Sequence, residues 1–385
     1  MQLTSEEIKR YGRHLVLEEF GMARQVKLKK SSVLVIGAGG LGCPALMYLA
    51  AAGVGSIGIV DNDTIDISNL QRQILYSTHD IGQLKADVAV NRLKALNPLI
   101  TVTAYPVRLT AQNALDIIRS YDVVIDGSDN FPTRYLVNDA CVLLDKPMIY
   151  GSILKFEGQV AVFNFQNSDG TFSSNYRDLF PLPPDPDEVP NCEQAGVIGV
   201  LPGLTGTMQA NEAIKILTSY GTPLTDKLLI IDADTASQTI IKIKNHQARK
   251  AITGLIDYDL FCSKSPGKNK SLEPDFNTTQ MKEITVEELK ALQDSGADFQ
   301  LIDVREPHEA DICTLGGELI PMSQVPANIA KIDKNKQVVV YCRSGRRSAD
   351  SIIWLERNHQ YTNLYNLKGG ILAWARDIDP DMPTY

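Results

Sequence analysis

The hydrophobic pattern of the first part of the chain alternates between short apolar runs and longer helical patterns. An apolar run at 32–37 (Ser-Val-Leu-Val-Ile-Gly) leads into a glycine-rich turn and a helical pattern, and a second apolar run follows at 56–61. A strand, a glycine turn, a helix and a strand within roughly 30 residues are typical of the βαβ unit of a parallel sheet. This part of the chain is therefore predicted to form an α/β domain whose sheet is mostly parallel.

The same periodicities predict the other elements of this domain. An amphipathic helix is expected over 4–30, with Thr4 or Ser5 as its N-cap. Further strands are predicted at 101–104, 122–126, 160–163 and within 227–243, and helices at 83–96, 131–145 and 205–219. Between 166 and 196 the pattern fails, and five prolines between 181 and 190 exclude a helix or a central strand. Connections of this length are usually functional or disordered.

A polar segment rich in Pro, Gly and Asn at 263–282 is predicted to be a linker. After it the pattern starts again, with a helix from Thr285, strands at 299–304 and 338–341, a helix at 344–357 and a short strand near 363–366. The expected organisation is a large α/β domain at 1–262 and a smaller α/β domain at 283–385.

Composition narrows the class of protein. The 385 residues are 44% hydrophobic and 22% charged, which is ordinary for a globular chain with room for two cores. The net charge of −8 argues against nucleic-acid binding, and no apolar run approaches the roughly 20 residues of a membrane helix. The N-terminus lacks signal-peptide features, and the six cysteines form no C-x-x-C pair. A cytoplasmic protein with reduced thiols is expected, without a nucleic-acid or membrane partner.

A glycine loop, Gly-Ala-Gly-Gly-Leu-Gly at 37–42, joins the first strand to its helix, and Asp61 ends the next strand. Glycines let the backbone approach a phosphate, the helix N-terminus favours its charge, and the carboxylate can accept ribose hydroxyls. On this motif alone, NAD-dependent oxidoreduction is as good an interpretation as ATP binding.

Arg72, Lys85 and a second carboxylate, Asp129 in Gly-Ser-Asp-Asn, favour ATP. Cations stabilise charge on a transferring phosphorus and a carboxylate can hold Mg²⁺, whereas an NAD site needs neither. Taken singly, Arg72 and Lys85 could be solvated surface charges. Together with the glycine loop they predict a Rossmann-like, ATP-binding domain.

Five motifs in order make residues 1–262 resemble the ThiF/MoeB superfamily, which is ubiquitin-activating-like. They are RYGRH, GAGGLGCP, VDNDTIDISNLQRQ, IGQLKA and DGSDN. Members of this superfamily adenylate the C-terminal glycine of small ubiquitin-like sulfur carriers, so the resemblance implies an adenylyltransferase with ATP and Mg²⁺.

The resemblance also implies roles for single residues. Asp129 would hold Mg²⁺ and act in catalysis with Arg72, and Arg13 would be an arginine finger donated across a homodimer to the other subunit's ATP. The residues implied to bind the nucleotide are Gly37, Gly39, Gly40, Gly42, Asp61, Asp63, Asn69, Arg72, Gln73, Lys85, Asp129 and Asn130.

One departure from the family concerns zinc. Members commonly carry two C-x-x-C pairs that bind a structural zinc, but the first pair would fall at Asn175-Tyr-Arg-Asp178 and the second between 243 and 256, where no cysteine occurs. Cys262 alone cannot supply the four ligands of a tetrahedral site. No zinc is predicted, and packing of the 227–262 segment is expected to replace it.

Cys192 lies in the proline-rich segment, in Val-Pro-Asn-Cys-Glu-Gln. Its position matches the family cysteine that takes the activated acyl group as a covalent intermediate, and a mobile loop suits such a nucleophile. The competing interpretation is a passive thiol on a loop.

Residues 283–385 resemble a rhodanese (sulfurtransferase) domain through LIDVREPHE, LIPMSQV, YCRSGRRS and LKGGILAW. The resemblance implies a persulfide on Cys342, because loop N–H groups and the following helix stabilise an anionic sulfur. The implied persulfide loop is Cys342, Arg343, Ser344, Gly345, Arg346 and Arg347. A phosphatase loop is the competing interpretation, but Arg347 lies one position short of that spacing.

Asp303 and Arg305 are predicted to form an ion pair that supports the fold, and Cys43, Cys141 and Cys313 are assigned to packing or surface.

Together the resemblances imply that ATP adenylates a carrier ending in Gly-Gly, and that sulfur from Cys342, loaded by a cysteine desulfurase or thiosulfate, converts it to a thiocarboxylate. The alternative is a scaffold that docks the carrier and has an inert rhodanese domain. The carrier and its pathway (molybdopterin, tRNA thiolation, thiamine or another thiocarboxylate route) stay open.

Overall fold

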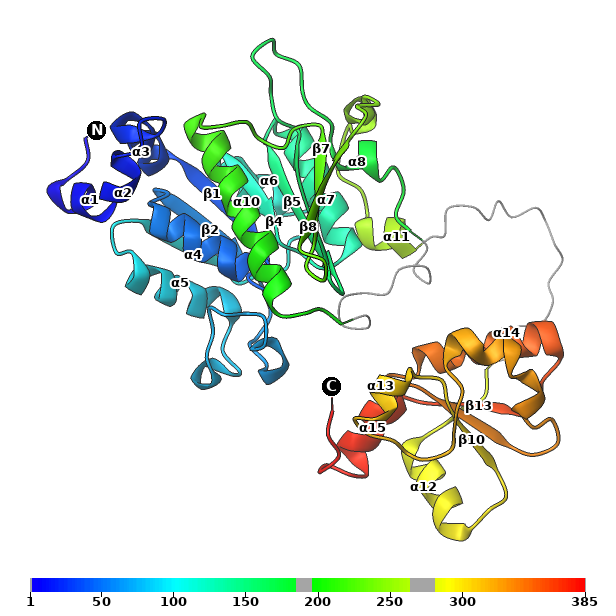
Figure 1. The fold of residues 1–385 in the computed structure, drawn as a ribbon. Helices are drawn as coiled ribbons and strands as arrows, with labels where there is room; N and C mark the ends of the chain where they lie inside the picture. The colour runs from blue at the N-terminus through cyan, green and yellow to red at the C-terminus, as the bar shows by residue number, and fades with distance from the viewer. Residues whose placement is uncertain (1, 185–195, 264–280, 385) are drawn as a thin grey trace. The chain divides into compact units, whose positions relative to one another are not determined.

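The computed structural model describes residues 2–184, 196–263 and 281–384. The chain divides into two compact units, Met1–Asn269 and Lys270–Tyr385 (Figure 1). Cys192 and residues 264–280 of the predicted linker lie outside the described residues. None of the helices in the described ranges combines the length and the apolar character that a membrane span requires.

The first unit is built on one eight-stranded sheet of order β3-β2-β1-β4-β5-β6-β7-β8. The strands from β3 to β5 in this order run parallel, and β6, β7 and β8 extend the sheet as antiparallel neighbours. Their bounds are β1 Ser32–Ile36, β2 Ser56–Val60, β3 Thr101–Tyr105, β4 Val123–Asp126, β5 Met148–Leu154, β6 Glu157–Phe163, β7 Lys227–Asp232 and β8 Ser237–Lys242. The predicted α/β class with a mostly parallel sheet is confirmed.

Helices cover both faces of this sheet. The α-helices are α1 Ser5–Arg10, α2 Gly12–Leu15, α3 Gly21–Lys30, α4 Gly42–Ala52, α5 Lys85–Leu96, α6 Ala114–Arg119, α7 Phe131–Leu143, α8 Tyr176–Leu179, α10 Val200–Thr218 and α11 Tyr258–Ser263. Short 3₁₀ turns lie at Ile67–Asn69, Thr78–Asp80 and Ala248–Ala251.

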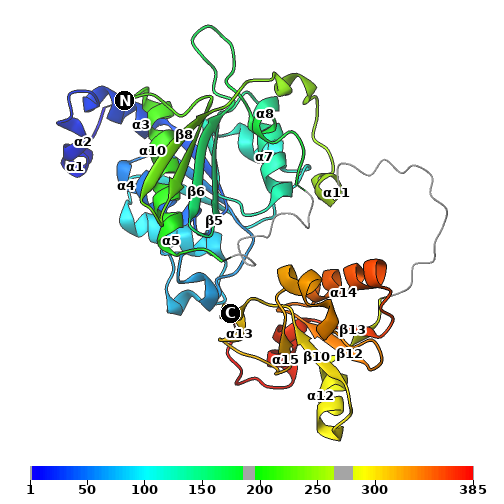
Figure 2. The ribbon, with the colours of Figure 1, turned by 45° about the vertical axis from the view of Figure 1, so that its right-hand side comes forward.

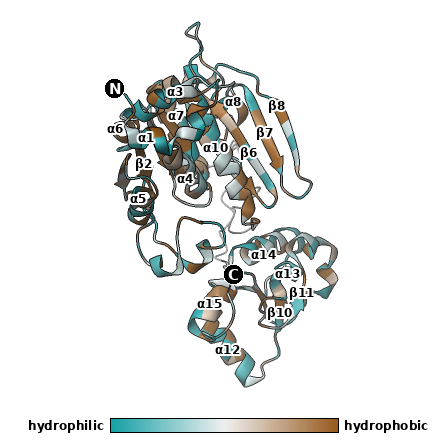
Figure 3. Ribbon diagram, turned by 60° about the vertical axis from the view of Figure 1, so that its left-hand side comes forward, coloured by the Kyte–Doolittle hydropathy of each residue, from teal (hydrophilic) through white to brown (hydrophobic). Residues whose placement is uncertain are grey.

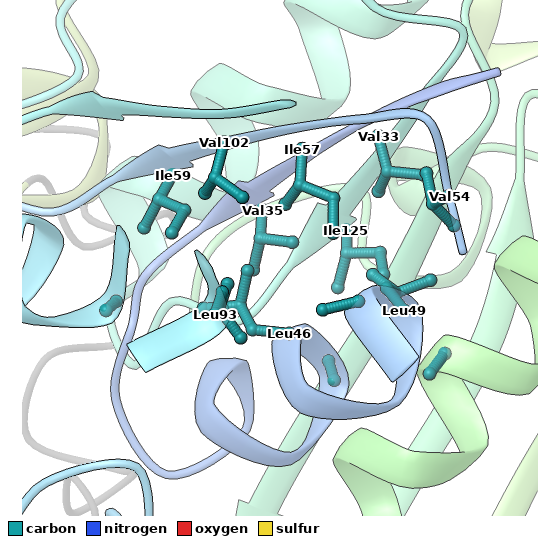
Figure 4. Packing of buried hydrophobic residues seen from close by; sticks show 14 of the residues in the cluster. Val33, Val35, Leu46, Leu49, Val54, Ile57, Ile59, Leu93, Val102 and Ile125 are labelled. Atoms are coloured by element: carbon teal, nitrogen blue, oxygen red, sulfur yellow. The ribbon is translucent and has the colours of Figure 1, made fainter. Parts of the chain in front are cut away.

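The alternation of side chains along β1 explains the two cores. Val33 and Val35 point to the face packed by α4, α5 and α10, as Figure 4 shows for Leu46, Leu49 and Leu93. Leu34 and Ile36 point to the other face, where side chains of α6, α7, α8 and α11 pack. Because both faces are buried, the parallel strands read as continuous apolar runs. In Figure 3, the edge strand β8 carries hydrophilic positions among hydrophobic ones, and all six of its residues are exposed.

One prediction for this unit is wrong, and one strand of its sheet was missed. The single helix expected over 4–30 is three helices, because the chain turns at Tyr11 (φ −95°, ψ 11°) and again before Gly21, which has φ +59°. Strand β5 was not predicted, since Gly151 interrupts its apolar run. A Cβ at Gly151 would lie 2.4 Å from the Gln209 side chain, so the glycine makes room for a residue of α10.

The second unit is a five-stranded sheet of order β11-β10-β12-β13-β9 in which all neighbours are parallel. Its strands are β9 Glu283–Ile284, β10 Gln300–Asp303, β11 Glu318–Leu319, β12 Val338–Tyr341 and β13 Leu364–Leu367. Its helices are α12 Val286–Ser295, α13 Pro307–Ala310, α14 Arg346–His359 and α15 Gly370–Asp377, with 3₁₀ turns at Met322–Ala327 and Ile329–Lys331.

Strand β12 lies in the centre of the second sheet. Val338 and Val340 pack with residues of α14, whereas Val339 and Tyr341 pack with residues of α12 and α15 on the opposite face. Figure 2 shows these helices around the sheet. The strands predicted at 299–304 and 338–341 and the helix predicted at 344–357 are confirmed within two residues at each end. The two-residue strands β9 and β11 are too short to give a periodic signal.

Candidate functional site

A cavity of about 540 Å³ lies at the carboxyl ends of β1, β2 and β4. This is the edge of an open parallel sheet where ligands bind, and the volume suits a nucleotide. The cavity brings together ten of the residues predicted to bind nucleotide: Gly37, Gly39, Gly40, Asp61, Asp63, Arg72, Gln73, Lys85, Asp129 and Asn130.

The floor of the cavity depends on close backbone contact. Gly37 has φ +88°, and a Cβ there would lie 2.8 Å from the carbonyl oxygen of Gly127. Asp61 accepts backbone N–H groups of Ala38 at 2.7 Å and Asp63 at 2.9 Å. Burial raises the pKa of Asp61, although Lys85 and these N–H groups oppose the shift. The glycine loop and the end of β2 therefore form one continuous surface.

Cationic side chains also line this cavity. Lys85, at the start of α5, is 6% exposed, and its Nζ lies 2.9 Å from Oδ2 of Asp63. Arg72 donates from Nη1 to the carbonyl oxygen of Ser68 at 2.9 Å, so its guanidinium is held at the rim. Both cations are positioned before any nucleotide binds.

The donor set fits ATP with Mg²⁺. Gln73 is 4% exposed and lines the cavity, and within the described residues its Oε1 atom has no hydrogen-bond partner. A ligand hydroxyl or amine could satisfy this atom. Asp129 is exposed to the cavity and supplies a carboxylate of the kind that Mg²⁺ uses together with phosphate oxygens.

A separate site surrounds Cys342 in the second unit. The cysteine follows β12 and is 1% exposed, and the loop after it ends at the first turn of α14. The N–H of Gly345 donates to Sγ at 3.2 Å, and Ser348 Oγ lies 3.4 Å from Sγ. A backbone N–H and a hydroxyl this close to one sulfur are groups that can donate to it when it is anionic.

One of the loop arginines, Arg347, forms an ion pair with a neighbouring helix. Arg347 donates from both terminal nitrogens to Glu309 of α13 at 2.6 Å, so this ion pair largely neutralises its charge. The predicted ion pair of Asp303 and Arg305 is confirmed at 2.6 Å, and Arg305 is fully buried. A phosphatase loop needs a free arginine near the Arg347 position, so this pairing weighs against that interpretation.

Comparison with known protein families gives a match for each of the two parts of the chain that hold these sites. The ThiF family model matches residues 11–252, and the rhodanese-like domain model matches residues 285–377. The first match covers more than half of the chain. The chain belongs to the ThiF family.

Two of three relatives of this ThiF-family chain align with its whole length, and the third aligns with about two thirds of it. The probable adenylyltransferase/sulfurtransferase MoeZ of Mycobacterium tuberculosis is 44% identical over the whole chain and 96% of its own length. The adenylyltransferase and sulfurtransferase MOCS3 of Aedes aegypti is 39% identical, over the whole chain and 90% of its length. The sulfur carrier protein adenylyltransferase of Thermus thermophilus is 52% identical, over 68% of this chain and 99% of its own. This chain is an enzyme that combines an adenylyltransferase with a sulfurtransferase.

Solved structures show the same fold for the ThiF part. PaaA has a TM-score of 0.54 at 22% identity and covers 63% of this chain and 75% of its own. Escherichia coli MccB with ATP has a TM-score of 0.54 at 22% identity, over 61% and 72%. At this identity the likeness establishes the fold alone.

Three residues predicted for the ThiF nucleotide site do not line the cavity. Gly42 starts α4, and the Oδ1 atom of Asn69 accepts the backbone N–H of Asp66 at 3.1 Å. Arg13 is exposed on α2 and lies outside the cavity of its own chain.

Several cavity residues were missed by sequence reasoning. Arg108 follows β3 and pairs with Asp259 of α11 at 2.9 Å across 151 positions. Arg134 of α7 is 6% exposed and donates to the carbonyl oxygen of Ser128 at 3.0 Å. This bond holds the turn that presents Asp129. An arginine inside an otherwise apolar helix pattern was the available signal for Arg134, whereas nothing local marked Arg108.

Asn175–Asp178, where the resemblance places the first C-x-x-C pair, contacts residues 246–248 through one carboxylate. Asp178, at 7% exposure, accepts the N–H groups of His246 at 2.8 Å and Ala248 at 3.1 Å through Oδ1. Its Oδ2 accepts both nitrogens of Asn175 at 2.8 Å. Asn175 and Asp178 do not fit zinc, and in the described ranges no group of three or more His, Cys, Asp or Glu is arranged to hold a metal. One carboxylate joins the two segments.

Metal analysis of the purified protein should therefore find well under one zinc per chain, and a chelator should leave the unfolding temperature unchanged. Asp178→Ala should cost about 3 kcal/mol, because four N–H donors lose a buried acceptor. The unfolding midpoint of the first unit should then fall by roughly 5–10 °C. Stoichiometric zinc, or a chelator that destabilises the wild type, would contradict this account.

Three further thiols do not line the cavity, although Cys43 donates from Sγ to the carbonyl oxygen of Ala38 in the glycine loop at 3.3 Å. Burial raises the pKa of the Cys43 thiol to about 12, and burial also raises the pKa of Cys141. Both are fully buried and pack in the core as predicted. Cys313 is partly exposed and lies beside Arg305.

Proposed function

We propose that this enzyme activates the C-terminal glycine of a ubiquitin-like sulfur carrier ending in Gly-Gly with ATP, and then converts it to a thiocarboxylate with sulfur carried on Cys342. The observation that carries the proposal is that one chain holds both a nucleotide cavity with Arg72, Lys85 and Asp129 and a buried thiol cradled by N–H and O–H donors. The name of the Thermus relative, sulfur carrier protein adenylyltransferase, supports the choice of substrate.

In the adenylation step, the carrier carboxylate attacks the α-phosphorus of ATP and pyrophosphate leaves. Arg72 and Lys85 stabilise the charge that develops on the phosphates. Mg²⁺, held by Asp129 together with phosphate oxygens, would neutralise further charge. Asp61 orients the ribose through its hydroxyls.

Arg13 completes this site from the partner subunit of a homodimer. It does not line the cavity of its own chain. An arginine supplied by another subunit can stabilise the charge that develops on the phosphates in the transition state. Apolar side chains near it are exposed, with Val16 at 78%, Leu17 at 51% and Met22 at 46%. Exposed apolar residues that gather in this way are typical of a protein interface.

In the sulfur step, Cys342 is first loaded by a cysteine desulfurase or thiosulfate. The persulfide attacks the acyl adenylate, or an acyl group on Cys192, and AMP or the Cys192 thiolate leaves. A thiol reductant then cleaves the resulting acyl disulfide and frees the thiocarboxylate and the Cys342 thiolate. The five cysteines of the described residues are free, which fits a reducing compartment such as the cytoplasm.

The proposal assigns adenylation to a domain at 1–262 and sulfur transfer to a domain at 283–385, joined by a linker at 263–282. The family matches end at 252 and begin at 285, on either side of the proposed linker.

Carrier-dependent exchange of pyrophosphate into ATP tests the first half, and mass spectrometry of candidate carriers for a thiocarboxylate tests the second. Carriers of the molybdopterin, tRNA-thiolation, thiamine and other thiocarboxylate routes should be compared. Exchange that is absent with every carrier would instead favour a docking scaffold.

Cys192→Ala should spare both half-reactions and lower their coupling, since its role is to hold the acyl group between them. Cys192 lies five positions before Val197, which lines the cavity. The measurement is carrier thiocarboxylate formed per AMP released. Full coupling in the variant would show that Cys192 is a bystander and that the persulfide attacks the adenylate directly.

A further inference from the structure

Ser348 lies between Cys342 and a buried amide. It occupies the third position of α14 and is fully buried, and Asn366 of β13 is 4% exposed. Ser348 Oγ is 2.7 Å from Asn366 Oδ1 and 3.4 Å from Cys342 Sγ. A hydroxyl has one hydrogen, so it can donate to only one of these two acceptors at a time.

We propose that Ser348 is a positioning residue whose single hydroxyl hydrogen moves from Asn366 to the Cys342 sulfur when that sulfur becomes anionic. This inference rests on the proposed role of Cys342. With a neutral thiol, the shorter contact keeps the hydrogen on Asn366, and the Ser348 lone pairs face Sγ and accept the S–H. With an anionic sulfur, a charge-assisted bond to Sγ is the stronger one, and the hydrogen turns toward it.

Asn366 can follow this change of the Ser348 hydrogen. Its amide can present either Oδ1 or Nδ2 to Ser348, so a half-turn of the amide replaces an acceptor by a donor. Asn366 then donates to Ser348 Oγ while Ser348 donates to Sγ. The N–H of Gly345 contributes a second, fixed donor at 3.2 Å.

The switch acts during loading from thiosulfate. The thiol proton leaves to water, and the thiolate attacks the outer sulfur of thiosulfate. The bond from Sγ to that sulfur forms, the S–S bond of thiosulfate breaks, and sulfite leaves with its electron pair. Charge is conserved and no external oxidant is needed, because the negative charge passes from Cys342 Sγ to the new terminal sulfur. Ser348 stabilises the anion that starts this step.

Charged groups on the surrounding elements are unchanged by substitutions at Ser348 or Asn366. They are Arg343 on the loop, Arg346 and Asp350 on α14, Lys368 after β13, and the ion pairs of Arg347 with Glu309 and Arg305 with Asp303. A shift in the pH dependence of Cys342 reactivity in these variants therefore reports on the hydroxyl and the amide.

The test is the pH dependence of Cys342 alkylation by iodoacetamide in the full-length protein, followed by mass spectrometry of the Cys342 peptide. Ser348→Ala should raise the pH of half-maximal rate by about one unit and slow sulfur transfer from thiosulfate at neutral pH about tenfold. Asn366→Ala should lower that pH by about half a unit, because the released hydroxyl is free to donate to Sγ. Opposite shifts cannot arise from general damage to the fold.

Ser351→Ala is the matched control. Ser351 lies one turn along α14, is 3% exposed, and donates to the carbonyl oxygen of Arg347 at 2.9 Å. Equal midpoints for Ser348→Ala and Ser351→Ala, or shifts of one sign for Ser348→Ala and Asn366→Ala, would overturn the inference. If Ser348→Ala does not fold, the Asn366→Ala variant alone tests the inference. A lower pH of half-maximal alkylation rate in that variant supports it, and a higher or unchanged pH contradicts it. Cys342→Ala distinguishes failure of this inference from failure of the proposed function. Sulfur transfer from thiosulfate that survives in this variant would contradict the proposed function itself.

Discussion

Cys342→Ala should abolish sulfur transfer from thiosulfate and carrier thiocarboxylate formation, while carrier-dependent exchange of pyrophosphate into ATP stays near wild type. Adenylation uses Arg72, Lys85 and Asp129 in the first unit, and the cysteine lies in the second unit. Without Sγ no covalent persulfide can form on this loop, so the expected loss is the whole catalysed rate. Both half-reactions should be measured on the same preparation.

Cys313→Ala provides the control for this prediction. Cys313 is a second thiol of the same unit, partly exposed and next to Arg305, and it lies after α13 rather than in the loop between β12 and α14. Its replacement should leave both half-reactions unchanged. A Cys342 variant that still made thiocarboxylate from thiosulfate would contradict the two-site scheme.

Asp129→Ala and Arg13→Ala should each reduce adenylation at least a hundredfold, because each removes charge that stabilises the phosphates in the transition state. Mixing the two variants should restore part of the activity if Arg13 acts in trans. In a heterodimer, the site that keeps Asp129 receives Arg13 from the other subunit. Random pairing leaves about a quarter of all sites intact, so roughly a quarter of wild-type exchange is expected.

Arg10→Ala is the matched control for the arginine finger. Arg10 lies on the neighbouring helix α1 and donates to the carbonyl oxygen of Leu96 at 3.0 Å, so it should be dispensable for exchange. If heterodimers of the Arg13 and Asp129 variants form, as native mass spectrometry can show, and stay as inactive as their parents, Arg13 does not act in trans.

The sequence pattern alone was sufficient to predict those features that depend on residues close together in the chain. The apolar run at 32–37, the glycine loop and Asp61 predicted a βαβ unit with a nucleotide cavity, since strand period, turn chemistry and helix start are short-range properties. The order of five motifs indicated the ThiF family for the same reason. The sulfur site at the cysteine between β12 and α14 was likewise predicted from the residues next to it in the sequence.

Tertiary structure decided which side chains meet. Arg347 pairs with Glu309 across 38 positions, and Ser348 meets Asn366 across 18. Asp178 reaches the N–H of His246 across 68 positions in the region where no zinc is predicted. The three motif arginines after Cys342 looked alike in sequence, because spacing gives no direction to a long side chain. Contacts between distant segments form only when sheets and helices pack, and these contacts determine which charges and donors face the reacting sulfur and the nucleotide.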